Sequence, residues 1–518
     1  MEKGSVKADF PIYFCENCNK ESVYHICEDC GKETKQMFYC ASCDKKTFSE
    51  SCNVHGRIRP YMNKRVNVTE YYKSAMKKLD IPNTIKIVKG VKGTSSSKHF
   101  TENLAKGILR AYYNIHVNKD GTIRYDVTEL PITHFKPKEI MADVKRLKDL
   151  GYDKDIYGNE LENENQILEL KPQDIILPAC PDSGDQKADD TFFNVSKFID
   201  TMLDKLYKIG PFYNLKKKED LIGQLTVTMA PHNCAGVITR IIGFSKVQGI
   251  LASPYVHAAV RRDCDGDEVA VMLLLDVLIN FSREFLPAHR GGTQDAPLVL
   301  NARVRAREVD DQILDLELGN YPLELYELAE KREHSSKVVF DNVKKRLKEG
   351  KDPLTNIGFT HDCSDFNHGV TNSSYKAIPT MDEKVQKQMD LVCKLRAVDS
   401  GDVARLLIER HFIRDIKGNF NKFTQQSFRC VDCNEIYRRP PLAGKCIALL
   451  NDGTTCNGRI IFTIAEGSIM KYLNVATNLT RNYNVPPYVT QSLEITKSAI
   501  ETIFGKDNEK QKDLKAWF

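Results

Sequence analysis

The chain has 518 residues, of which 41% are hydrophobic and 28% are charged, and its formal net charge at pH 7 is +5. This composition is typical of a globular protein, and the length indicates three or more modules. The longest apolar run, residues 269–281, contains Asp276 and is shorter than the ~20 residues that a membrane-spanning helix needs, so it predicts a buried strand or helix. No apolar segment follows Met1, so we expect neither a secretory signal nor a membrane partner.

Residues 1–60 are dominated by cysteine pairs and are predicted to form zinc-ribbon modules. The pairs "CENC", "CEDC" and "CASC" are followed by one more cysteine and a histidine. In a chain without a secretory signal, this spacing favours zinc over disulfides, and a redox role is the alternative. His55 is either a ligand or a histidine of a solvent-facing loop. The simplest grouping gives one ion to Cys15, Cys18, Cys27 and Cys30, and another to Cys40, Cys43, Cys52 and His55.

Residues 61–210 mix strand-like and helix-like runs, and residues 211–310 are rich in β-branched residues and glycine. The second segment contains "VRRDCDGDE", in which Asp263, Asp265 and Asp267 alternate with other residues. On an extended segment, alternate side chains point the same way, so three carboxylates would converge and attract a hard cation such as Mg²⁺. Arg261 and Arg262 would then neutralise phosphates nearby. The alternative is an acidic turn that faces solvent.

Helical periodicity prevails in residues 311–425 and again in residues 466–505. Between them, residues 426–465 hold a second cysteine cluster and predict a further zinc ribbon. Every predicted zinc site has four protein ligands and no open position, which is typical of structural zinc, and we expect three such ions in the chain. The ligands of the second cluster would be Cys430, Cys433, Cys446 and Cys456.

The tail, residues 506–518, is charged, begins near a glycine and ends in "QKDLKAWF". Its spacing resembles the box by which replication proteins bind the sliding clamp (PCNA). One helical turn would place the apolar side chains on one side as a hydrophobic plug. A terminal helix that docks on its own domain is the alternative. The residues of the predicted box are Gln511, Leu514, Trp517 and Phe518.

Longer motifs add a family resemblance. The segments "VHAAVRRDCDGDEVAVMLLLD", "GFTHDCSDFNHGV" and "FRCVDCNEIYRRPPLAGKC" resemble the large subunit of archaeal family-D DNA polymerase, and the likeness covers nearly the whole chain. It implies an α+β multidomain protein whose catalytic core is a double-psi β-barrel, as in multisubunit RNA polymerases. On this resemblance, residues 211–310 form that barrel, residues 61–210 support it and the DNA, and zinc ribbons and a helical C-terminal region complete the chain.

The resemblance also implies roles for particular residues. Asp265 and Asp267 match the catalytic carboxylates, which would hold two Mg²⁺ ions. Asp263 stands where the family usually has asparagine and matches the RNA polymerase pattern instead. Gly291, Gly292 and Asp295 lie in a further family string and would support the site. The residues expected to contact DNA or nucleotide are His257, Arg261, Arg262, Arg290, Lys89 and Lys92, the last two being equally compatible with a solvated strand edge.

The function expected from the resemblance is that of a DNA-dependent DNA polymerase acting on primer-template DNA and deoxynucleoside triphosphates. Its partners would be the N-terminal portion of the large subunit, a small proofreading-exonuclease subunit and the sliding clamp, in the cytoplasm of an archaeal cell at the nucleoid. We expect no exonuclease in this chain. Two alternatives remain open: a non-catalytic zinc-ribbon module that binds DNA and the clamp, and an RNA polymerase-like enzyme, which Asp263 would favour.

Overall fold

The structure, a computed structural model, divides the chain into two compact units. The first comprises Met1–Asn320 and Phe340–Ser373, and the second comprises Tyr321–Val339 and Ser374–Phe518. The residues that the structure describes are 4–81, 85, 87–90, 101–118, 121–231, 233–262, 264–281, 298–305, 314, 316–318, 321–338, 341–353, 364–449, 454–462, 464 and 466–504.

The N-terminal part of the first unit consists of short antiparallel strand pairs between two longer strands. β1 (Ser5–Pro11) pairs with β9 (Tyr61–Asn67) along its whole length, so both ends of the cysteine-rich segment meet in one ribbon. Helix α1 (Val68–Leu79) follows directly, and the Asn67 side chain caps it by accepting from Thr69 N. The short strands are β2 (Tyr13–Cys15), β3 (Lys20–Ser22), β4 (Lys35–Gln36), β5 (Phe38–Cys40), β6 (Lys45–Thr47), β7 (Ser51–Cys52) and β8 (Gly56–Arg57).

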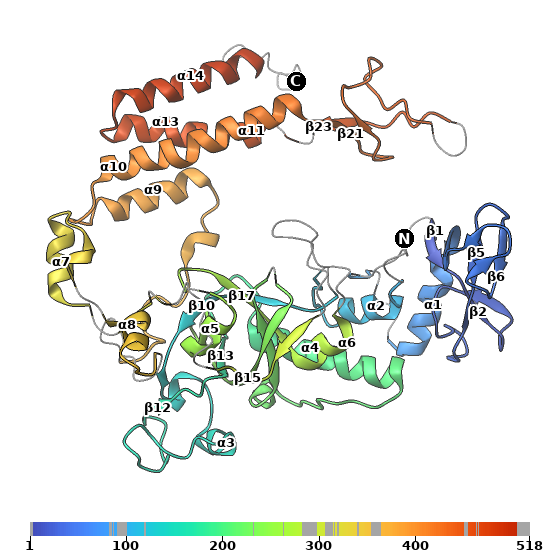
Figure 1. The fold of residues 1–518 in the computed structure, drawn as a ribbon, viewed down its shortest axis with the longest axis horizontal. Coiled ribbons are helices and arrows are strands. Elements are labelled where there is room, and N and C mark those ends of the chain that lie inside the picture. The colour runs from blue at the N-terminus through green and yellow to red at the C-terminus, as the bar shows by residue number, and fades with distance from the viewer. Residues whose placement is uncertain are drawn as a thin grey trace, which may run out of the picture. The chain divides into compact units, whose positions relative to one another are not determined.

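A closed β-barrel forms the centre of the first unit (Figure 1). Its strands follow one another in the order β13-β16-β10-β17-β14-β15, and β13 pairs with β15 to close the ring, while β18 adds to the outer edge of β15. The strands are β10 (Tyr125–Pro131), β13 (Asp174–Pro178), β14 (Leu225–Met229), β15 (Ala235–Ser245), β16 (Ile250–Ala252), β17 (Glu268–Leu273) and β18 (Val299–Asn301).

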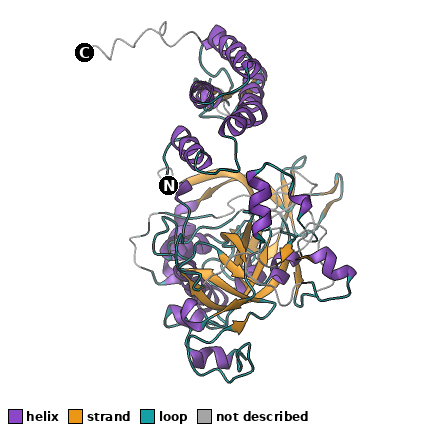
Figure 2. Ribbon diagram, turned by 90° about the vertical axis from the view of Figure 1, so that its left-hand side faces the viewer, coloured by secondary structure: helices purple, strands orange, loops and turns teal. Residues whose placement is uncertain are grey.

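Burial explains why these segments form strands. Every residue of β13 is buried, including Asp174, and so is every residue of β17 after Glu268, because apart from Asp174 these segments are continuous apolar runs. Helices pack against the barrel, where Figure 2 shows purple helices beside the orange strands. The helices α4 (Ala188–Met202), α5 (Pro254–Ala259) and α6 (Leu274–Asn280) contact its strands directly. The other helices of this part of the unit are α2 (Leu104–Tyr112), α3 (Val144–Asp149) and α8 (Val343–Lys348). Two further strand pairs are β11 (His134–Phe135) with β12 (Leu168–Glu169), and β19 (Glu317–Leu318) with β20 (Asp341–Asn342).

The structure bears on two features expected from the sequence, the extent of the barrel and the apolar run 269–281. The barrel is not confined to residues 211–310, because β10 and β13 come from the preceding segment. Sequence periodicity describes each strand alone and does not reveal which distant strand closes a barrel. The apolar run 269–281 becomes a strand and then a helix, β17 and α6. β17 contributes Val269, Val271 and Leu273 to the main apolar cluster, and its Ala270 and Met272 belong to a second cluster that also contains Val277 of α6.

The second unit is mainly helical. α10 (Ser400–Leu406) continues through a π-helical turn, Leu407–Phe412, into α11 (Ile413–Gln425), and the helices share one apolar core that includes Ile408, Phe412 and Leu473. A three-stranded sheet of β21 (Phe428–Cys430), β22 (Ile436–Tyr437) and β23 (Ile460–Phe462) interrupts them. The other helices are α7 (Leu323–Glu330), α9 (Met381–Val392), α12 (Glu466–Met470), α13 (Leu473–Asn482) and α14 (Pro487–Phe504). Within the described ranges, no helix has the length and apolarity to cross a membrane.

Candidate active site and metal centres

The aspartate string lies on the loop that joins α5 to β17. Ser253 caps α5 by accepting from Tyr255 N, and Pro254 occupies the first helical position, so the helix starts sharply at the barrel. The loop then bends repeatedly, with positive φ angles at Arg261 (62°), Cys264 (61°) and Gly266 (114°). The extended geometry expected from the sequence is therefore wrong. The spacing of the acidic residues predicted the segment, but not its left-handed turns.

Asp267 is held at the end of this loop by both its backbone and its side chain. Its carbonyl oxygen accepts from Glu129 N of β10 at 3.1 Å, which fixes the loop to the barrel. Its carboxylate Oδ2 accepts from Arg262 Nη1 at 2.9 Å. Arg262 is itself anchored, because its backbone N donates to the carbonyl of His257 at 3.1 Å. The loop thus presents Asp267 in one defined orientation.

Asp265 is exposed on the same loop, two residues from the half-buried Asp267. Carboxylate oxygens are the ligands that Mg²⁺ prefers, so this donor set fits the cation that the sequence predicted. Asp263 lies outside the described residues. Lys92, Arg290, Gly291, Gly292 and Asp295 also lie outside them.

His257 lies beneath the loop instead of on its surface. Only 1% of its surface is exposed, and its Nδ1 is 2.7 Å from Oε1 of Glu129, which is equally buried. This burial argues against a direct contact between His257 and primer or triphosphate, because the side chain packs against Glu129 of β10. Sequence analysis missed Glu129. Its signal is a charged residue at an inward position of the strand-like "YDVTELP", where an apolar side chain is the norm.

Lys89 lies in a segment that makes hydrogen bonds to other residues of the first unit. Its Nζ donates to Asn114 Oδ1 at 3.0 Å, and its backbone N donates to the carbonyl of Gly107. The neighbouring Gly90 carbonyl accepts from the buried Arg110 at 2.7 Å. Among the described residues, no contact joins Lys89 to the aspartate loop, so its expected contact with phosphate stays a prediction.

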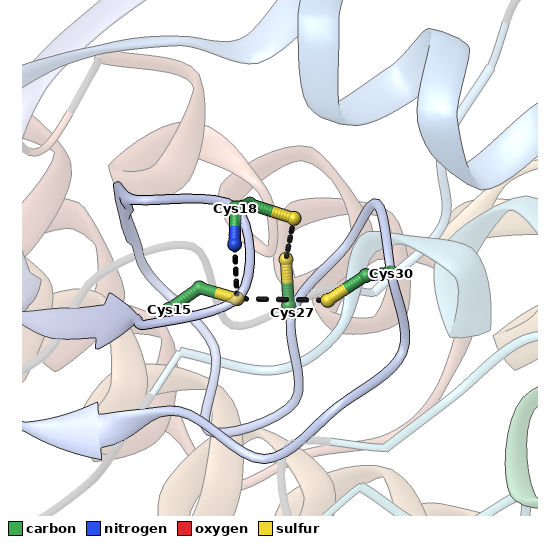
Figure 3. A group of neighbouring side chains, drawn as sticks. All are labelled: Cys15, Cys18, Cys27 and Cys30. Carbon is green, nitrogen blue, oxygen red and sulfur yellow. Dashed lines mark hydrogen bonds between the residues drawn. The ribbon is translucent and has the colours of Figure 1, made fainter.

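The structure brings together the first predicted zinc ligand set (Figure 3). The sulfur atoms of Cys15 and Cys30 are 3.5 Å apart, and those of Cys18 and Cys27 are 3.9 Å apart. Ligand atoms of all four residues lie within 4.8 Å of one another. A hydrogen bond from the backbone of Lys32, helped by the neighbouring thiols, lowers the pKa of Cys30 to about 6, so one thiolate is available at neutral pH. Thiolates in this arrangement suit tetrahedral Zn²⁺.

The second set includes the histidine that the sequence left open. His55 Nδ1 lies 3.1 Å from Cys43 Sγ, 3.6 Å from Cys40 Sγ and 3.7 Å from Cys52 Sγ. The four ligand atoms again gather within 4.8 Å. Backbone hydrogen bonds from Val54 and His55 lower the pKa of Cys52 to about 6. This geometry favours His55 as a ligand over a loop histidine that faces solvent.

The third predicted ligand set lies in and beside the three-stranded sheet of the second unit. Cys430 Sγ is 3.7 Å from Cys456 Sγ, and Cys433 Sγ is 3.4 Å from Cys446 Sγ. A Cβ at Gly458 would lie 2.6 Å from Cys430 Sγ, so the backbone approaches the cluster too closely for a side chain there. Ligand atoms of all four residues lie within 4.8 Å of one another, although Cys446 and Cys456 are ten positions apart in the sequence. The predicted clamp-binding residues Gln511, Leu514, Trp517 and Phe518 lie outside the described residues.

Comparison with known proteins gives a consistent result. Residues 82–384, more than half of the chain, match the family model "DNA polymerase II large subunit DP2, catalytic domain". The chain is similar to the DNA polymerase II large subunits of Archaeoglobus fulgidus (46% identity over 98% of this chain), Nanoarchaeum equitans (42% over 99%) and Pyrococcus furiosus (40% over 97%). It spans 44%, 44% and 40% of the length of these relatives, respectively.

Proposed function

Because the chain belongs to the family of DNA polymerase II large subunits, we propose that it supplies the nucleotidyl-transfer site of a DNA-directed DNA polymerase. The single observation that carries the proposal is the loop between α5 and β17, where Arg262 and the backbone of Glu129 fix Asp267 beside the exposed Asp265. One carboxylate held in a fixed direction, with a second carboxylate two residues away on the same loop, suits the positioning of a hard cation.

In the proposed reaction, the 3′-oxygen of the primer attacks the α-phosphorus of a deoxynucleoside triphosphate. A new P–O bond forms, the bond to the β-phosphate oxygen breaks, and pyrophosphate leaves. Two bound Mg²⁺ ions would lower the pKa of the attacking hydroxyl and stabilise the leaving oxygen. Asp265 and Asp267 would hold these ions, and Asp263 would assist them. Arg261 would contact the phosphates, whereas Arg262 orients Asp267.

The finer parts of the proposal concern the barrel and its surroundings. We take the closed barrel to be a double-psi β-barrel, which its mixed parallel and antiparallel pairings support. Lys89, Lys92 and Arg290 would contact DNA or nucleotide, and the string that contains Gly291, Gly292 and Asp295 would support the site. The three cysteine clusters would hold structural Zn²⁺, because four thiolates converge in the first and third, and three thiolates and one imidazole in the second, without a carboxylate.

The proposed partners come from the family resemblance, and the chain spans less than half the length of the three relatives. The remainder of the large subunit and a small proofreading subunit would complete the enzyme on primer-template DNA. The tail 506–518 would tether it to the sliding clamp. A chain that ends at residue 510 should lose binding to the clamp, measured by surface plasmon resonance, while its primer extension without clamp stays unchanged. Equal clamp binding by both chains would exclude the tether.

The test of the catalytic proposal is primer extension by the assembled enzyme. Asp265→Ala and Asp267→Ala should each reduce the rate by about 10²–10³-fold, as expected when a group that stabilises the transition state is removed. Asp149→Ala, an exposed aspartate of α3, is the matched control. Full activity in both site variants would leave the non-catalytic adaptor as the better description. Preference for ribonucleoside triphosphates would favour the RNA polymerase-like alternative.

A further inference from the structure

We propose that Glu129, His257 and Cys264 form a fourth metal site, specific for a zinc-class transition metal and distinct from the magnesium site and the three cysteine clusters. The three residues come from three elements: β10, α5 and the aspartate loop. One ligand atom from each lies within 4.8 Å of the other two. The barrel therefore places an oxygen, a nitrogen and a sulfur donor around one point directly below the loop.

Two buried polar atoms of Glu129 and His257 lack hydrogen-bond partners in the described part of the chain, which supports a bound ligand. His257 Nδ1 and Glu129 Oε1 are 2.7 Å apart, a hydrogen bond that accounts for one polar atom of each side chain. The other two, His257 Nε2 and Glu129 Oε2, are buried and have no hydrogen-bond partner within the described part of the chain. Both side chains are 1% exposed or less. A buried polar atom without a partner costs about 1–3 kcal/mol, so two in one dyad suggest a ligand that satisfies them.

The donor types identify the class of cation. Mg²⁺ takes oxygen ligands, whereas a set of one carboxylate, one imidazole and one thiolate suits Zn²⁺ and similar borderline metals. One carboxylate and one thiolate also balance the charge of a divalent ion, which favours binding in a buried place. Three protein ligands leave one coordination position for water.

Cys264 is half-buried, so a metal ion would reach the site from the side of this residue. The bound ion would also hold the loop in place. Cys264 immediately precedes Asp265, so an ion shared with Glu129 and His257 would fasten the loop to two elements of the barrel wall. Its binding can be measured without DNA or nucleotide. The inference therefore stands or fails separately from the polymerase proposal.

The experiment uses the full chain with its three cysteine clusters saturated with zinc, then titrated with Co²⁺ in excess Mg²⁺. We expect one further equivalent of Co²⁺ to bind and to give a near-ultraviolet band for charge transfer from a single thiolate. Cys264→Ala should abolish this band. Cys234→Ala, a buried cysteine of the same unit that belongs to no ligand group in the described part, should retain it. A wild-type chain that binds no further Co²⁺ overturns the inference.

Two more variants keep the test decisive. Glu129→Gln preserves a hydrogen-bond acceptor for His257 but removes the anionic ligand, so it should weaken Co²⁺ binding at least ~10-fold. Asp267→Asn should retain the thiolate band, because the magnesium carboxylates are not its ligands. Loss of the band in Asp267→Asn would assign the Co²⁺ to the aspartate site and refute a separate one. Circular dichroism and zinc content verify that each variant is folded.

Discussion

Arg262 donates a hydrogen bond from Nη1 to Oδ2 of Asp267 at 2.9 Å and so fixes the direction of a proposed metal-binding carboxylate. The Asp267 side chain is 41% exposed and that of Arg262 is 15% exposed. An ion pair in such a setting contributes only ~0–1 kcal/mol to stability. Its value lies in orientation. Three residues of the loop have positive φ angles, and two of them carry side chains that disfavour this conformation, so contacts such as this one help to hold the loop in place.

The first prediction concerns this pair. Arg262→Ala should slow primer extension by about 10²-fold, since a displacement of the order of 1 Å at a reacting centre has that effect. The midpoint of thermal unfolding should stay near that of the wild type. Arg262→Lys should recover part of the rate, because it restores the charge without the planar fork. Arg303→Ala, an exposed arginine of the same unit, is the control. A wild-type rate in Arg262→Ala would show that Asp267 is oriented without it.

The second prediction concerns metal removal. Cys30→Ala should release one zinc ion and loosen residues 13–36, because short strands with little apolar core depend on the ion for their stability. Hydrogen exchange in β2 and β3 should become faster, whereas exchange in the barrel strand β17 should not change. Cys393→Ala removes an exposed cysteine from the second unit and should leave zinc content unchanged. Unaltered zinc content in Cys30→Ala would contradict the ligand assignment.

The sequence predicted the metal ligand sets well because their signal is local. Spacing alone grouped Cys15, Cys18, Cys27 and Cys30, and the structure places their sulfur atoms together. The alternating aspartates similarly located the loop, and the family resemblance led to a catalytic interpretation. Both signals depend on residue types that lie a few positions apart in the sequence, and such residues stay close together in the folded chain.

What the sequence did not predict depends on long-range packing. The pairing of Glu129 with His257 joins residues 128 positions apart, and only closure of the barrel brings them together. The family resemblance implied that His257 contacts DNA or nucleotide, and nothing in its local sequence indicated that it would be buried beside Glu129. Likewise, β10 and β13 could not be assigned to the barrel from periodicity, because a strand's partners are set by topology and not by its own pattern.

The third prediction concerns a fully buried arginine that organises the segment before α2. Arg110 makes two hydrogen bonds to the Glu102 carboxylate, at 3.0 and 2.8 Å, and others to the carbonyls of Gly90 and Gly121. Arg110→Ala should lower the free energy of unfolding by about 3–5 kcal/mol, since it removes one partner of a buried pair. Urea titration of the full chain gives this difference.

Glu102→Gln is the informative companion to that variant. It keeps the shape of the side chain and one acceptor oxygen, so it should cost less than Arg110→Ala. The Glu102 side chain is 18% exposed and loses less hydration on burial than Arg110 does. An equal loss in both variants would mean that the carboxylate, and not the two backbone carbonyls, provides most of the stabilisation.

The last prediction concerns Asp276, a carboxylate that α6 buries completely. Burial raises its pKa above the ordinary value, although hydrogen bonds from Ile123 N and Asn280 Nδ2, each at 2.8 Å, lower it in part. The folded state therefore holds the proton to a higher pH than the unfolded state does. Between the two pKa values the folded state binds more protons, so its stability falls as pH rises from the unfolded value of ~3.9 to the raised folded value.

Asp276→Asn removes this titration and makes the sign measurable. Its amide accepts one hydrogen bond but presents N–H groups to the second donor, so at acidic pH it should destabilise the chain by about 1–3 kcal/mol. The difference from wild type should shrink as pH rises, because only the wild type then carries the cost of a buried charge. Urea titrations of both chains at matched pH values test this, and release of zinc at low pH affects both equally. A difference that grows with pH would show that the ionised carboxylate is favoured in the folded state, as it would be if its hydrogen bonds outweighed burial.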